Sequence, residues 1–144
     1  METAGWTHAE IQPTNALVTH DGHAAVIDNA LTCGPGDDRR VLLPGSSHAP
    51  ELATAILSTP ADTHIPAQPT ADIWSMGASL FWCWAGYRPV PYDDTTDRLE
   101  KLAAITKCTT TALRDVRSWP FPEFEDAITA CLTPDAPTGP PRRS

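Results

Sequence analysis

The hydrophobic pattern of the chain is densest over residues 70–86, TADIWSMGASLFWCWAG. Thr70 is suited to the N-cap of a helix, where its hydroxyl can accept a hydrogen bond from a first-turn N–H. Gly86 is suited to the position after the last turn, where positive φ is common. Because apolar residues occupy nearly every side between them, the pattern predicts a central helix buried all round. The stretch is too short for a membrane span.

A β-hairpin is predicted before this helix. Asp21-Gly22 is a tight-turn dipeptide between two short apolar runs, the second covering residues 24–28. Residues 8–15 form the loop that leads into the hairpin. The following segment, residues 29–50, is rich in Gly, Pro, Asp and Ser and predicts a long loop.

Three more helices are predicted from apolar residues at helical spacing. They cover residues 51–57, 97–106 and 122–132. The inward positions of the last two are Leu99, Leu102, Ile105, Phe124, Ile128 and Leu132.

Composition places these elements in one domain, residues 1–133, followed by a flexible Pro-rich tail at 134–144. A net charge of −8 argues against a nucleic-acid binder, which would carry a basic stripe. No charged segment followed by an apolar run marks a signal peptide, so we expect a cytoplasmic protein without a membrane association.

Cysteine and histidine spacing gives little support for a metal site. The four cysteines are widely separated, without a CxxC pair, and are expected to be buried reduced thiols: Cys33, Cys83, Cys108 and Cys131. His20 and His23 flank the predicted turn and are expected to be exposed, since no third ligand accompanies them.

Four short motifs occur in a fixed order: HAEIQPTN at 8–15, DNA at 28–30, APE at 49–51 and DIWSMG at 72–77. Together they resemble the H-R-D-L-K-P-x-N, D-F-G, A-P-E and D-x-W-S-x-G motifs of the C-terminal lobe of protein kinases. The resemblance covers nearly the whole chain. It implies a mainly α fold with a short β-hairpin, in which residues 5–30 form the catalytic-loop and metal-loop hairpin, residues 31–51 an activation-like segment, and the buried helix the centre of the lobe.

The resemblance also implies roles for individual residues. Glu10 stands in place of the catalytic Asp and Gln12 in place of the phosphate-contacting Lys, while Asn15 and Asp28 match the Mg²⁺ ligands. The structural positions of the family fall at His8, Glu51, Asp72 and Trp74. Asp72 is expected to accept hydrogen bonds from backbone N–H groups of the loop around residues 8–10.

Several departures from the family pattern weaken the predicted chemistry. Glu10 moves the carboxylate outward by one methylene, and a shift of about 1 Å can cost on the order of 100-fold in rate. Gln12 removes a positive charge beside the transferring phosphoryl group. Ala9 replaces the Arg that pairs with a phosphorylated loop, and Asn29 replaces the Phe of D-F-G. The Arg that pairs with Glu51 in the family falls at a glycine, so this pair is expected to be missing unless an arginine of the tail supplies it.

His8 lies so close to Met1 that we expect no N-terminal lobe, and therefore no cover for a nucleotide. Three hypotheses follow. The chain is a pseudokinase-like subunit, without a cofactor of its own, whose bare surface binds a protein partner. Alternatively, it is half of a split Ser/Thr protein kinase that uses Mg²⁺ and ATP once another chain supplies the lobe. A third hypothesis is a non-functional fragment of a longer kinase-domain protein.

Overall fold

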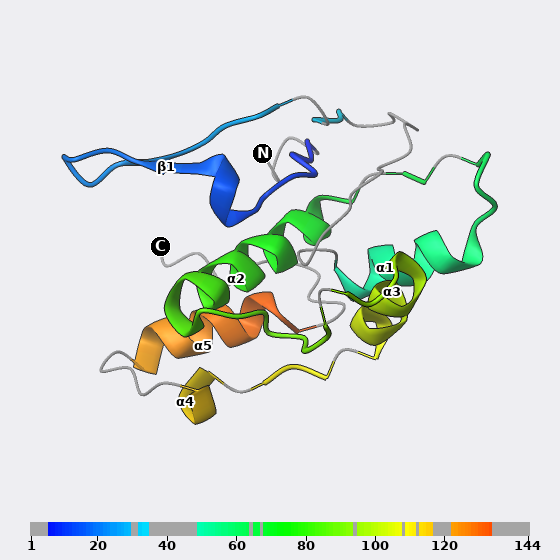
Figure 1. Ribbon diagram of the computed structural model, residues 1–144. Coiled ribbons are helices and arrows are strands. Elements are labelled where there is room, and N and C mark those ends of the chain that lie inside the picture. Colours follow the sequence, from blue (N-terminus) through cyan, green and yellow to red (C-terminus); the bar gives the residue numbers. More distant parts are fainter. Residues whose placement is uncertain are drawn as a thin grey trace.

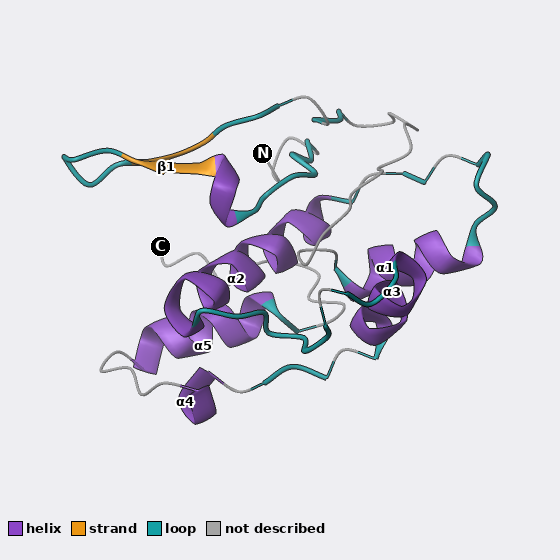
Figure 2. Cartoon of the chain, viewed as in Figure 1, coloured by secondary structure: helices purple, strands orange, loops and turns teal. Residues whose placement is uncertain are grey.

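The computed structural model describes residues 6–29, 32–34, 49–63, 65–66, 68–93, 95–107, 109–111, 113–116 and 122–133. The described chain is mainly helical with one antiparallel β-hairpin, as the sequence predicts (Figures 1 and 2). Its elements are η2 (Pro13–Asn15), β1 (Ala16–Val18), β2 (Ala24–Val26), α1 (Pro50–Ser58), α2 (Pro69–Ala85), α3 (Arg98–Thr106), α4 (Leu113–Val116) and α5 (Pro122–Cys131).

Helix α2 crosses the middle of the molecule, with α5 packed along it and the hairpin on the other side (Figure 1). Trp74 and Phe81 project from α2 into the core and are almost completely buried. A side chain at Gly77 would place its Cβ only 2.5 Å from the Cβ of Cys131. The absence of a Cβ at this position therefore lets α5 lie directly against the α2 backbone. Helices α1 and α3 pack together at the far end of the molecule.

The two ends of α2 show how local sequence sets its length. The helix begins at Pro69 rather than after Thr70, so the predicted Thr70 N-cap is wrong. Proline suits the first helical position because its fixed φ is helical and its missing N–H would be unpaired there. The predicted end is confirmed, because Gly86 has φ 82° and donates its N–H to the carbonyl of Trp82 at 2.8 Å.

The expectation that α2 is buried on all sides is wrong for one face. Met76 and Leu80 are 44% and 38% exposed, and Cys83 is exposed as well, contrary to its prediction as a buried thiol. Leu80 lies one turn after Gly77, the position against which α5 packs, so these residues lie beside that contact and stay exposed. The thiols of Cys33 and Cys131 are buried as predicted.

Smaller corrections concern the remaining elements. Asp97 caps α3 by accepting hydrogen bonds from the N–H groups of Leu99 and Glu100, but Leu99 is 62% exposed and not part of the core. Leu102 and Ile105 are the buried residues of this helix. Strand β2 ends at Val26, short of the predicted 24–28, because Asp28 adopts a left-handed conformation. Helix α4 was not predicted, since four residues are too few to show a period.

Most of the activation-like segment, Cys108 and the tail at 134–144 lie outside the described residues. Within the described part of the chain, no helix combines the length and the apolar character needed to cross a membrane.

Candidate functional site

Asp72 links the start of α2 to the loop at residues 8–10. Its Oδ2 accepts a hydrogen bond from the backbone N–H of His8 at 2.6 Å, and its Oδ1 accepts one from Ala9 at 2.9 Å. The contact predicted for Asp72 is thus confirmed, between positions 64 residues apart. Burial raises the pKa of the Asp72 carboxyl above its ordinary value, while the two N–H donors and His8 act in the opposite direction.

The loop held by Asp72 is buried and conformationally unusual. Ala9 has φ 69°, a left-handed value that costs an L-residue energy unless its surroundings impose it. His8 is only 2% exposed, and its Nδ1 accepts a hydrogen bond from the N–H of Glu10 at 3.2 Å. The neutral ring therefore carries its proton on Nε2, which has no acceptor among the described residues.

Asn15 closes the loop from its other end. Its side-chain Nδ2 donates to the carbonyl oxygen of Glu10 at 2.9 Å, and its backbone N–H donates to Gln12 at the same distance. The side chain of Asn15 is buried, whereas those of Glu10 and Gln12 are half-buried. Three of the predicted site residues, Glu10, Gln12 and Asn15, therefore belong to one hydrogen-bonded turn.

The hairpin brings Asp28 back to Asn15. Ala16 pairs with Val26, and the N–H of Ile27 donates to the carbonyl of Asn15 at 2.9 Å, so Asp28 follows directly after this pair. Asp28 has φ 65° and an exposed side chain. The structure therefore places the two predicted Mg²⁺ ligands at the same end of the hairpin.

The donor chemistry of this pair fits a hard cation in part. Asn15 uses its amide nitrogen on Glu10, which leaves the amide oxygen as the ligand atom, and Asp28 contributes a carboxylate. No group of three or more His, Cys, Asp or Glu residues suited to a metal occurs in the described chain. Two oxygen ligands suffice for Mg²⁺ only where phosphate and water oxygens complete the octahedron.

Glu51 and Trp74 occupy the remaining predicted positions. Glu51 is half-buried in the first turn of α1, and no cation contacts it within the described residues. Trp74 is 2% exposed, and its indole N–H lacks an acceptor in the same set of residues.

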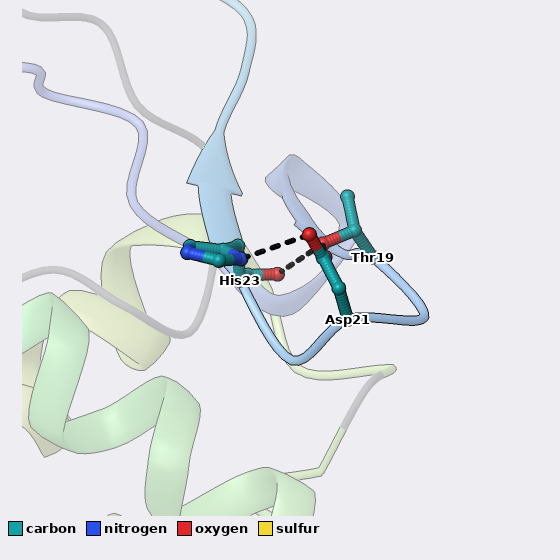
Figure 3. Close-up of polar contacts among 3 residues, drawn as sticks. All are labelled: Thr19, Asp21 and His23. Carbon is teal, nitrogen blue, oxygen red and sulfur yellow. Dashed lines mark hydrogen bonds and ion pairs between the residues drawn. The ribbon is translucent and has the colours of Figure 1, made fainter.

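The hairpin turn is a separate polar cluster (Figure 3). The hydroxyl of Thr19 donates to the carboxylate of Asp21, and His23 Nδ1 lies 3.1 Å from the same carboxylate. Hydrogen bonds from Thr19 and His23 lower the pKa of the Asp21 carboxyl. His20 and His23 are exposed, as predicted, and the contacts among Thr19, Asp21 and His23 stabilise the turn.

A second surface feature was missed by the sequence reasoning. The Arg88 guanidinium lies 4.8 Å from the ring centre of Trp82 and 4.7 Å from that of Tyr92. Beside it is an open cleft of about 450 Å³ lined by Tyr87, Arg88, Pro91, Tyr92 and Asp93. An arginine between aromatic residues in the segment after a predicted helix is the signal that would have indicated this cluster.

No protein-family model matches the sequence, and no curated protein matches it either. Solved structures do resemble its fold. The autoinhibited serine kinase domain of the giant muscle protein titin has a TM-score of 0.74 and 17% sequence identity over 96% of this chain, and a structure of titin kinase with its flanking domains has a TM-score of 0.73 at the same identity and coverage.

This chain spans only 41% of the first of those chains and 24% of the second. At such low identity the likeness concerns the fold and not the activity. The described chain, mainly α-helical with a short hairpin and organised around α2, therefore has the fold of a protein-kinase-like C-lobe.

Proposed function

We propose that this chain is a pseudokinase-like, partner-binding domain that does not transfer phosphate from ATP on its own. The observation that carries the proposal is the exposure of the hairpin. All six residues of β1 and β2 are apolar and exposed, and Val18 is 77% exposed. Leu17 and Ile27 lie on one face of the ribbon and Val18 and Val26 on the other, so neither face rests on a core.

A two-stranded ribbon that is apolar on both faces is marginal in water unless another surface covers it. A covering partner would remove apolar area worth about 25 cal/mol per Å². The replacements at the catalytic positions support the same proposal. Glu10 places its carboxylate one methylene further out than an Asp would, and Gln12 lacks the positive charge of a Lys beside the transferring phosphoryl group. We place the partner surface on this hairpin, in a protein that we expect to work in the cytoplasm.

The experiment compares dye binding and self-association of the purified chain with those of a Val18→Glu variant. The wild-type chain is expected to bind an environment-sensitive apolar dye and to self-associate in light scattering, and Val18→Glu is expected to reduce both. Leu99→Glu is the matched control, because Leu99 is also an exposed apolar residue but lies on α3. A monomeric wild-type chain that binds no dye, or an equal effect of both variants, would overturn the proposal.

Nucleotide binding tests the proposal that the chain alone does not use ATP. We expect calorimetry to detect no binding of Mg²⁺–ATP at micromolar concentration and thermal shift to give no gain in melting temperature. A micromolar dissociation constant for the chain alone would contradict this expectation.

The placement of Asn15 and Asp28 at one end of the hairpin favours a second candidate, the split protein kinase. In that case Asn15 and Asp28 would hold Mg²⁺, which would neutralise phosphate charge, and Glu10 would orient the acceptor hydroxyl. Adding a chain that carries an N-terminal kinase lobe should then produce ATP turnover. Glu10→Gln should abolish that turnover, and unchanged turnover would remove Glu10 as the base.

A further inference from the structure

One face of α2 forms an apolar stripe that the described chain leaves uncovered. Met76, Leu80 and Cys83 are exposed and follow each other at intervals of four and three residues, so they lie above one another on a helix. Ser79 also lies within this face, and its hydroxyl donates to the carbonyl of Ser75 at 2.7 Å. Its polar group is thus already satisfied inside α2.

The stripe is bordered by ordered structure at its N-terminal end. Asp72 lies one turn before Met76 on the same side of the helix, and its carboxylate is engaged by the loop of His8 and Ala9. Toward the C-terminus, the stripe runs about two turns to Cys83 without another polar contact from the described residues. The loop therefore limits an occupant to the last three turns of α2, on the side next to the α5 contact, since Leu80 lies one turn after Gly77.

The geometry of the stripe favours a helix as its occupant. An extended strand or loop laid on an apolar helix face would leave its backbone N–H and C=O groups unpaired, because α2 has no backbone donors or acceptors to offer along its side. A helix satisfies its own backbone and can place its side-chain ridges into the grooves between Met76, Leu80 and Cys83.

Charge indicates which kind of helix fits. The chain has a net charge of −8. Helix α5, which packs on α2, carries three acidic residues and no basic one in its described sequence: Glu123, Glu125 and Asp126. The C-terminal end of α2 adds the negative end of its dipole. A helix with basic residues beside its apolar face is therefore the complementary partner.

We propose that the stripe of Met76, Leu80 and Cys83 is the docking site for one basic amphipathic helix of a partner chain. This inference rests on the proposed partner-binding function and adds a second contact, on α2, to the one on the hairpin. Cys83 would be covered by the docked helix, which makes its thiol a reporter of occupancy.

The test uses the full chain carrying Cys108→Ser and two labelled helical probe peptides, one of leucine and lysine and one of leucine and glutamate. Cys83 is then the exposed thiol among the described residues, and burial raises the pKa of the Cys131 thiol, which slows its reaction. We expect the basic peptide to bind in fluorescence anisotropy, to slow the reaction of Cys83 with a thiol reagent about tenfold, and to bind much more tightly than the acidic peptide.

Variants locate the binding. Leu80→Glu and the milder Met76→Gln are expected to weaken the basic peptide about tenfold, whereas Leu99→Glu on α3 is expected to leave its affinity unchanged. Both stripe residues are partly exposed, and circular dichroism checks that the variants remain folded. The inference is overturned if Cys83 stays reactive at saturating peptide, if Val18→Glu but not Leu80→Glu abolishes binding, or if Cys83 is protected only by self-association of the chain. The second of these results would leave the hairpin proposal standing, so the two failures are distinguishable.

Discussion

Replacing Gly77 by alanine tests the packing of α5 on the central helix. The new Cβ would lie 2.5 Å from the Cβ of Cys131 and 3.4 Å from Cγ of Leu132. Carbon atoms in favourable contact are about 3.5–4.0 Å apart, so the first distance is short by about 1 Å. Because both Cβ atoms are fixed to helix backbones, no rotamer change can relieve the overlap, and one helix must move.

Two effects of opposite sign decide the outcome. Alanine improves the intrinsic helix propensity of the position by about 1 kcal/mol, whereas overpacking in a tight core costs about 1–3 kcal/mol. The overlap is with backbone-fixed atoms, so we expect a cost near the upper end and a net destabilisation of about 2 kcal/mol. For a chain of this length, that corresponds to roughly 6 °C in melting temperature.

Urea unfolding followed by tryptophan fluorescence measures this difference. In a double-mutant cycle, Cys131→Gly should relieve the overlap and Cys131→Ala should not, since only glycine removes the Cβ. A gain in stability for Gly77→Ala, of the size that helix propensity alone predicts, would refute the packing described for α2 and α5.

Further predictions concern Asp72 and Arg88. Asp72→Ala leaves the N–H groups of His8 and Ala9 without their acceptor and should cost about 1–3 kcal/mol in urea unfolding; an unchanged midpoint would mean that water replaces the carboxylate. Burial raises the pKa of Asp72 in the folded state. This shift stabilises the fold at pH values below the unfolded-state pKa, and the stabilisation is lost as pH rises through the folded-state pKa. The stability of the wild type relative to Asp72→Asn should therefore fall from about pH 4 upward, and a rise would show that the two N–H donors outweigh burial. Arg88→Ala should cost about 1–2 kcal/mol through its contacts with two rings, and Arg88→Lys less; equal losses would assign the effect to the aliphatic stem.

Local signals in the sequence accounted for most of the secondary structure. The turn dipeptide and Gly86 each act through their own backbone neighbourhood, and both lie where they were expected. The bond from Asp72 to the loop could be predicted because a family motif places it, although it spans 64 positions.

The errors arose where burial depends on what packs against an element. The composition of α2 indicated an apolar helix, but it could not show that Met76 and Leu80 would remain exposed. Leu99 fitted the helical period of α3 as well as Leu102 did, yet Leu102 is buried and Leu99 is 62% exposed on a helix that packs against α1. Periodicity gives the direction of a side chain, whereas the packing partner decides whether it is covered.

The conformation of the loop at residues 8–15 does not by itself indicate catalysis, because hydrogen bonds within the fold can maintain it. The left-handed conformation of Ala9 costs about 1–2 kcal/mol. Two hydrogen bonds to a carboxylate, each worth about 1.5–3 kcal/mol, offset that cost. The loop would therefore keep its shape, and with it the position of Asn15, whether or not phosphate is ever transferred. The chemistry depends instead on charge and reach at Glu10 and Gln12, so turnover measurements on those two residues discriminate between a binding domain and a split enzyme, and the backbone geometry does not.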